Sequence, residues 1–100
     1  MNPEKQRKLD NIGRFVMPLE VRDALNWNLA DSFTATYNQE GNALTLTRTP
    51  EGKLTMNDLG LVQLPKLILA QLGWGEGDTI NVSACTQQGV ISLKLYQKAV

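Results

Sequence analysis

Apolar and polar residues alternate along two stretches of this 100-residue chain, 31–49 and 78–96, and a glycine-containing loop interrupts each stretch. Alternation with a period of two is typical of a strand with one buried face, so each stretch predicts a β-hairpin. A shorter apolar segment precedes each hairpin and contains a proline, Pro18 or Pro65. Proline is favoured in the first turn of a helix, so a helix of about two turns is expected at each of these prolines. The pattern therefore predicts a mostly β fold with two short helices.

The two halves of the chain repeat one pattern at a constant offset of 47 residues. Without a gap, the offset aligns Gly13 with Gly60, Pro18 with Pro65, Leu25 with Leu72, Trp27 with Trp74, Asp31 with Asp78 and Leu46 with Leu93. Two cores of about 50 residues would each be marginal, so residues 1–100 are predicted to form a single domain. We assign residues 5–48 to a first repeat, 49–53 to a linker and 54–97 to a second repeat. The strands of each repeat are expected to complete the sheet of the other, which leaves few open edges.

Several repeated residues have a structural explanation. Gly13 and its counterpart follow turn-forming residues and suit a backbone with positive φ. Gly73 is expected to end the second helix in the left-handed conformation, and Asn26, at the equivalent place, is a residue that tolerates that conformation. Two interpretations are open for Trp27 and Trp74, stacking on nucleic-acid bases or anchoring the core. Their equivalent places beside the helix ends favour the core.

Charge is balanced overall, at ten basic and ten acidic residues, but it is unevenly distributed. All four arginines lie in the first half of the chain: Arg7, Arg14, Arg22 and Arg48. An anion-binding face is therefore expected in the first half alone. Arg48 ends the first hairpin and is interpreted as an ordinary surface charge, and Lys5 is interpreted as flexible.

Composition also limits the chemistry. The chain has no histidine and one cysteine, Cys85, so metal clusters, intrachain disulfides and conventional nucleophile–base pairs have almost no residues to draw on. We predict a protein that is not an enzyme and that has no cofactor and no metal site. The N-terminus lacks the apolar run of a secretory signal, and polar residues interrupt the apolar stretch 59–74. A cytoplasmic protein without membrane association is expected.

The segment RKLDNIGRFVMPLEVR, residues 7–22, has the pattern R-K-x-D-x-x-G-R-x-x-x-P-x-E-x-R. This pattern resembles the DNA-binding domains of the AbrB/SpoVT family, whose fold also occurs in MazE-like antitoxins and, as two copies in one chain, in MraZ-type regulators. The resemblance implies a swapped-hairpin β-barrel, here a single-chain pseudo-dimer of the two repeats. It also implies contacts to double-stranded DNA from basic side chains, which correspond to Arg7, Lys8, Arg14 and Arg22. Asp10 would hold the turn or orient a neighbouring arginine. The family often has a second basic residue at the position of Asp23, where this chain is acidic.

The second repeat keeps the framework of the pattern and loses its charges. Thr55, Leu61 and Leu69 stand at the positions equivalent to Lys8, Arg14 and Arg22, and Leu67 stands at the position of Glu20. One interpretation is that Leu61, Leu67 and Leu69 form a contact patch through which two chains pair, giving a homo-oligomer. The other is local repacking within one chain.

Three functions are compatible with these patterns. The leading prediction is a DNA-binding transcriptional regulator that uses the arginines and lysine of the first repeat. The second is an antitoxin-type protein that binds a toxin partner and regulates its own gene. The third is a protein-interaction or assembly module whose DNA-binding face has degenerated. Binding that depends on arginine and on salt separates the first function from the third.

Overall fold

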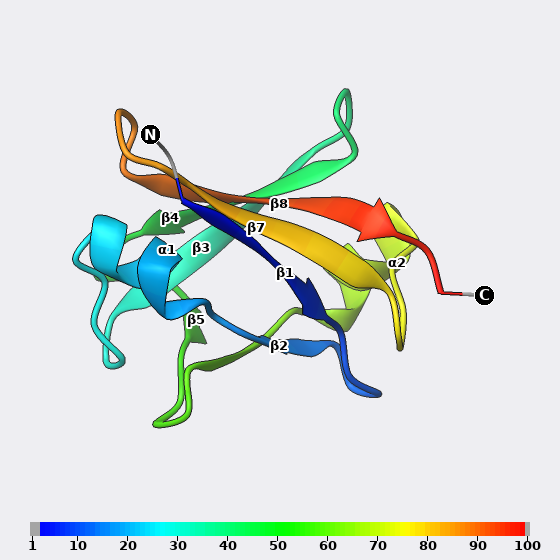
Figure 1. The fold of residues 1–100 in the computed structure, drawn as a ribbon, viewed down its shortest axis with the longest axis horizontal. Helices are drawn as coiled ribbons and strands as arrows, with labels where there is room; N and C mark the ends of the chain where they lie inside the picture. The colour runs from blue at the N-terminus through cyan, green and yellow to red at the C-terminus, as the bar shows by residue number, and fades with distance from the viewer. Residues whose placement is uncertain (1–2, 100) are drawn as a thin grey trace.

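The computed structural model describes residues 3–99, and it is mostly β with two short helices, as predicted. The elements are, in chain order, β1 (Glu4–Lys8), β2 (Arg14–Val16), α1 (Leu19–Ala24), β3 (Ser32–Asn38), β4 (Ala43–Arg48), β5 (Leu54–Thr55), β6 (Leu61–Gln63), α2 (Lys66–Leu72), β7 (Thr79–Cys85) and β8 (Val90–Gln97). Six strands form one curved sheet in the order β1-β7-β8-β4-β3-β5, and β2 and β6 form a second, two-stranded sheet. Figure 1 shows β2 below the curved sheet, with the two helices at opposite ends.

All four pairings between the repeats are antiparallel. The first strand of each repeat lies on the hairpin of the other, since β1 pairs with β7 and β5 pairs with β3. The remaining strands meet their own counterparts, β2 with β6 and β4 with β8. The equivalence is incomplete, because β1 pairs along five residues and β5 only along two, Leu54 and Thr55. The described part of β3 after Phe33 therefore has no strand beside it on that edge, which is more open edge than the sequence predicted.

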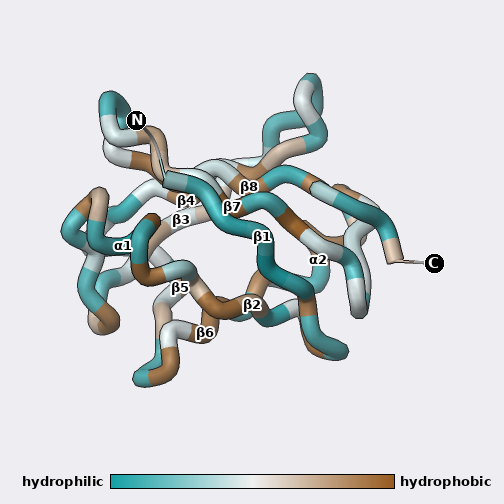
Figure 2. Tube along the Cα trace, viewed as in Figure 1, coloured by the Kyte–Doolittle hydropathy of each residue, from teal (hydrophilic) through white to brown (hydrophobic). Residues whose placement is uncertain are grey.

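A single hydrophobic core draws on both repeats. The residues that are at most 1% exposed include Phe15, Phe33 and Leu44 from the first repeat and Val62, Ile80 and Leu93 from the second. Burial along β7 alternates residue by residue, as expected for a strand with one face on the core. Figure 2 shows hydrophobic residues along β2, where the two repeats meet. Within residues 3–99, none of the helices has the length and apolar character needed to cross a membrane.

The helix boundaries follow the predicted signals with one shift. Gly73 ends α2 at φ 74°, and Asn26, just after α1, has φ 56°, so both adopt the left-handed conformation. The two prolines lie one residue before the helices rather than in their first turns, and their carbonyls accept the first helical hydrogen bonds. Trp27 and Trp74 are 3% and 5% exposed, so they anchor the core and are not available to stack on bases.

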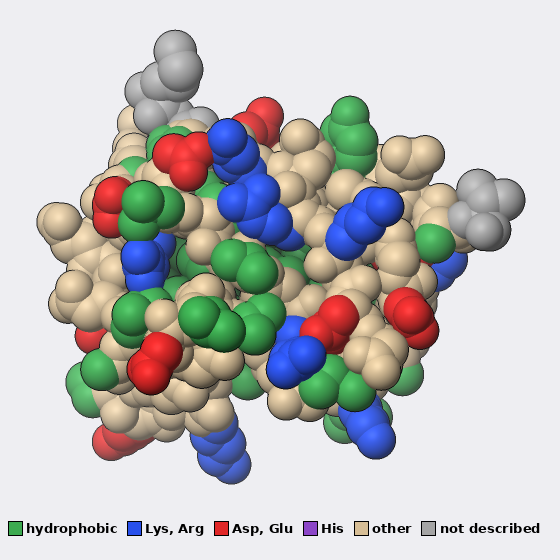
Figure 3. Space-filling view, turned by 60° about the horizontal axis from the view of Figure 1, so that its bottom comes forward, with side chains coloured by type: hydrophobic (Ala, Val, Ile, Leu, Met, Phe, Trp, Pro, Cys, Tyr) green, Lys and Arg blue, Asp and Glu red, His purple; other side chains and the backbone are tan. Residues whose placement is uncertain are grey.

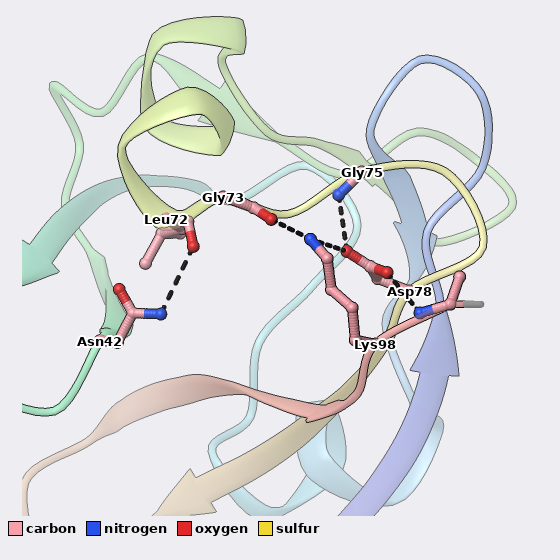
Figure 4. Close-up of polar contacts among 7 residues, drawn as sticks. Asn42, Leu72, Gly73, Gly75, Asp78 and Lys98 are labelled. Atoms are coloured by element: carbon pink, nitrogen blue, oxygen red, sulfur yellow. Dashed lines mark hydrogen bonds and ion pairs between the residues drawn. The ribbon is translucent and has the colours of Figure 1, made fainter.

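Residues 98 and 99 are held against the turn after α2. Asp78 is only 2% exposed, and its carboxylate accepts hydrogen bonds from the amides of Gly75 and Ala99, each at 2.8 Å. Lys98 Nζ lies 3.3 Å from the same carboxylate and also donates to the carbonyl of Gly73 (Figure 4). Nearby, the side chain of Asn42 donates to the carbonyl of Leu72 at 3.4 Å, which links the first hairpin to α2.

The buried carboxylate of Asp78 makes the free energy of unfolding depend on pH. Burial raises the pKa of Asp78, but hydrogen bonds from Ala99, Gly75 and Lys98 outweigh it and hold the pKa below its ordinary value. A lowered folded-state pKa contributes stability that is present above about pH 4 and is lost as the pH falls through the folded-state pKa. We expect Asp78→Asn to cost about 2 kcal/mol at pH 7 and less at pH 3, below the ordinary carboxyl pKa. Urea unfolding of both proteins at the two pH values measures this, and a cost that does not change with pH would contradict it.

Candidate nucleic-acid interface

The turn that precedes β2 is built in the same way as the turn that precedes β6. Asp10 Oδ1 accepts hydrogen bonds from the amides of Ile12 and Arg14, at 3.0 and 2.8 Å. Asn57 Oδ1 accepts the two equivalent bonds from Leu59 and Leu61, at 2.9 and 3.0 Å. The glycine in each turn has φ +79°, as predicted from its position. One side-chain oxygen is therefore enough to shape the turn, and a charge is not required.

In the first repeat the second carboxylate oxygen has a further role. Asp10 Oδ2 lies 2.6 Å from Arg14 Nε, and the two side chains are 33% and 38% exposed. Burial raises the pKa of Asp10. Hydrogen bonds from the backbone amide and the guanidinium of Arg14 lower this pKa by more than burial raises it, so the pKa lies below its ordinary value. The bond engages Nε only, so Nη1 and Nη2 of Arg14 have no partner among residues 3–99. Asp10 thus both holds the turn and orients the arginine.

The second repeat suggests a test that separates the two roles of Asp10, holding the turn and orienting Arg14. We expect Asp10→Asn to keep the turn, because asparagine performs the same role at position 57, and to leave the thermal midpoint close to that of the wild type. Asp10→Ala removes both hydrogen bonds of the turn and should lower the midpoint clearly. Thermal unfolding followed by circular dichroism compares the three proteins. Equal midpoints for the asparagine and alanine variants would show that the side-chain oxygen does not support the turn.

Arg7 and Arg22 lie near each other but differ in their partners. Arg7, on β1, donates from Nε to the carbonyl of Val16 at 3.1 Å and from Nη1 to the carbonyl of Gln6 at 3.0 Å. Arg22, on α1, is half-buried, and its Nε is buried without a hydrogen-bond partner. Within residues 3–99, the guanidinium of Arg22 makes no hydrogen bond or ion pair. The guanidinium of Arg22 therefore has no directly bonded partner among the described residues.

Arg7 and Arg22 both line one groove of about 330 Å³ between β2, α1 and the turn before β6. Its walls include three exposed apolar side chains, Val16, Leu19 and Leu59. Figure 3 shows a face of the molecule on which hydrophobic side chains gather, with lysine and arginine side chains around them. Arg14 lies on the same strand as Val16 and two residues from it, so its side chain is on the same side of β2.

Lys8 does not join this groove. Side chains along β1 alternate between two faces, so Lys8 is on the opposite face from its neighbour Arg7. It lines a separate hollow with Gln97 and Lys98. The structure thus brings together three of the four predicted basic residues and separates the fourth.

The three leucines of the predicted patch differ in their surroundings. A Cβ built on Gly13 would overlap Cδ1 of Leu69, so the side chain of Leu69 packs over the first-repeat turn of its own chain. This contact favours the alternative of local repacking for Leu69, and its assignment to an oligomer interface stays a prediction. Leu61 is half-buried and pairs with Val16 across the two-stranded sheet. Leu67, which is 73% exposed, remains available for the predicted pairing of chains.

Two basic residues that were given no structural role have one. Arg48 donates to the carbonyl of Asn26 at 2.8 Å and to Asp31 at 3.0 Å, and its guanidinium lies 6.0 Å from the ring centre of Trp27. Its interpretation as an ordinary surface charge is wrong. Lys5 forms an ion pair of 3.0 Å with Glu20 beside the groove. Only the alternation along β1, which places Lys5 on the face of Arg7, could have signalled this contact.

The comparison with known proteins adds no further residue to this site. No protein-family model, curated protein or solved structure matches the chain. The candidate interface is therefore defined by the chain's own geometry: the oriented guanidinium of Arg14, the anchored one of Arg7 and that of Arg22, which has no directly bonded partner among the described residues.

Proposed function

We propose that this protein is a DNA-binding transcriptional regulator whose first repeat contacts the backbone of duplex DNA. The observation that carries the proposal is that Arg22 makes no side-chain hydrogen bond or ion pair among the described residues and lines a groove together with Arg7. An arginine without a partner can donate charge-assisted hydrogen bonds to an external anion, and phosphate oxygens suit its planar fork. The resemblance of residues 7–22 to the AbrB/SpoVT pattern supports the same conclusion.

The proposed architecture is the swapped-hairpin pseudo-dimer of that family, made by one chain. The reciprocal pairing of β1 with β7 and of β5 with β3 supports it, as does the meeting of β2 with β6. In this arrangement the second repeat completes the fold, and its apolar residues at the positions of Arg14 and Arg22 leave DNA contact to the first repeat.

The three arginines would act in different ways. Asp10 engages only Nε of Arg14, so a phosphate or a guanine edge could accept hydrogen bonds from the remaining Nη1 and Nη2. Arg22 and Arg7 would contact phosphates along the groove. The helix on this face, α1, has only six residues, so phosphate positioning and DNA shape would dominate, and sequence selectivity would be modest.

A salt series on duplex binding tests the function. Fluorescence anisotropy with a labelled duplex gives the affinity between 50 and 200 mM salt. Three to four phosphate contacts predict a slope of log affinity against log salt of about −2.7 to −3.6. A flat response would reject the proposal and favour the assembly-module alternative.

A further inference from the structure

We propose that the groove between β2 and α1 also binds a small amphipathic oxyanion, a carboxylate or phosphate that carries a short apolar chain. The oxyanion would bind Arg22 and Arg7. Its apolar chain would contact the exposed side chains of the groove, Val16, Leu19 and Leu59. Binding of this anion would also compete with DNA, and this competition rests on the function proposed above. The binding itself does not depend on it.

The charged end of the site is Arg22. It lacks a partner among residues 3–99, whereas Arg7 beside it is held by two backbone carbonyls and Arg14 is held by Asp10. The buried unpaired atom is Nε, so Nη1 and Nη2 are the atoms that can donate charge-assisted hydrogen bonds to an oxyanion in the groove. The anchored guanidinium of Arg7 provides a second positive charge in the same groove.

The apolar end of the site distinguishes it from a simple phosphate contact. Six large hydrophobic side chains are exposed in the described residues: Ile12, Val16, Leu19, Leu59, Leu67 and Tyr96. Three of the six, at 44%, 54% and 76% exposure, line this one groove. Contact with a DNA phosphate does not use such a wall, whereas an alkyl chain gains free energy by covering it.

The site occurs in the first repeat alone. At the equivalent place in the second repeat, Leu69 fills the space over Gly13. In the first repeat Arg22 stands where Leu69 would, and Gly60 lines the groove beside it. We therefore expect one amphipathic anion per chain.

Two carboxylates also line the groove. Glu20 is paired with Lys5 at 3.0 Å, and its own backbone amide and Lys5 hold its pKa below the ordinary value. Asp58 is exposed on the turn before β6 and has no ion pair within residues 3–99. Its charge opposes an incoming anion, so it limits the affinity of the site.

Calorimetric titration without DNA tests the site directly, with hexanoate, acetate, hexanol and hexyl phosphate as probes. We expect hexanoate and hexyl phosphate to bind with a stoichiometry of one and hexanoate to bind at least tenfold more tightly than acetate, since four added methylene groups cover apolar wall. Hexanol should bind weakly because it lacks the charge. Hexanoate that binds no better than acetate, or no better than hexanol, would overturn the proposal.

Three variants locate the bound anion. Arg22→Leu copies the residue of the second repeat and should reduce hexanoate affinity at least tenfold. Leu59→Asn changes an exposed side chain and should bring hexanoate affinity towards that of acetate. Asp58→Asn should raise the affinity about two- to threefold by removing a repulsive charge. Unchanged hexanoate affinity in all three variants would place the anion elsewhere and reject the site.

A competition measurement then separates the two proposals. Saturating hexanoate should weaken duplex binding at least tenfold in the wild type and much less in Leu59→Asn. Hexanoate binding without any duplex binding would support the groove and reject the proposed function. Duplex binding that saturating hexanoate does not change would reject competition at Arg22.

Discussion

Replacing Arg14 and Arg22 together by alanine is expected to weaken duplex binding about 100-fold at low salt. Each guanidinium that contacts a phosphate through charge-assisted hydrogen bonds contributes about 1.5 kcal/mol, which is about a factor of ten in affinity. Two lost phosphate contacts should also reduce the magnitude of the salt slope by about 1.8. Fluorescence anisotropy with wild type and double variant across the same salt series measures both quantities.

The chain offers a matched control for this loss of charge. Lys66 and Lys94 belong to the second repeat and are exposed, and neither forms an ion pair within the described residues. Replacing these two lysines by alanine removes the same net charge from the other half of the molecule. We expect affinity to change less than about threefold, because the remaining effect is long-range and screened by salt. An equal loss in both double variants would mean that net charge, and not the first-repeat face, determines binding.

The Arg22→Leu variant should weaken duplex binding without lowering the stability of the fold. Leucine occupies the equivalent position in the second repeat and packs well there, so the fold is known to accept it in that environment. The substitution also removes a half-buried charge without a described partner, so stability should not fall. A stable variant with about tenfold weaker duplex binding is the expected result.

Gly52→Ala is expected to be the most destabilising single substitution considered, at about 3 kcal/mol. A Cβ on Gly52 would overlap the backbone N, C and O atoms of Phe33, and backbone atoms in a paired strand cannot move aside as a flexible side chain can. For a domain of this size the melting temperature should fall by about 12–24 °C. Gly75→Ala is the control, because no atom lies within 4 Å of its added Cβ, and it should change stability by less than about 1 kcal/mol. Similar melting temperatures for the two variants would contradict the close packing at Gly52.

The local features of the fold could be predicted because they depend on neighbours in the sequence. The alternation in residues 31–49 and 78–96 defined both hairpins, and the residue types at Asn26 and Gly73 defined the helix ends. Gly52 could not be recognised in the same way. It lies in a linker where glycine is ordinary, and its importance comes from Phe33, a strand residue of the preceding hairpin.

The sequence predicted which arginines belong to the candidate site, but it did not predict which of them have hydrogen-bonded partners. The motif selected Arg7, Arg14 and Arg22, and the structure places them on one side of the molecule. Which guanidinium is paired depends on contacts between elements, such as Arg7 with the carbonyl of Val16, and no local pattern specifies these. The same reason explains why the sequence could not decide between the two interpretations of Leu69 and why the contacts of Arg48 were not predicted, since each side chain contacts a segment distant in the chain.

The pairing of β1 with β7 has a consequence for biosynthesis. Glu4 lies beside Ser83, and Lys8 lies beside Thr79, so β1 leaves the ribosome well before its partner strand β7 has been synthesised. During that interval its backbone groups are exposed to other nascent chains, and premature termination after the first repeat would leave it without a partner. Fusing the two repeats into one translation product places that partner in the same molecule, so the final assembly step needs no encounter between separate polypeptides.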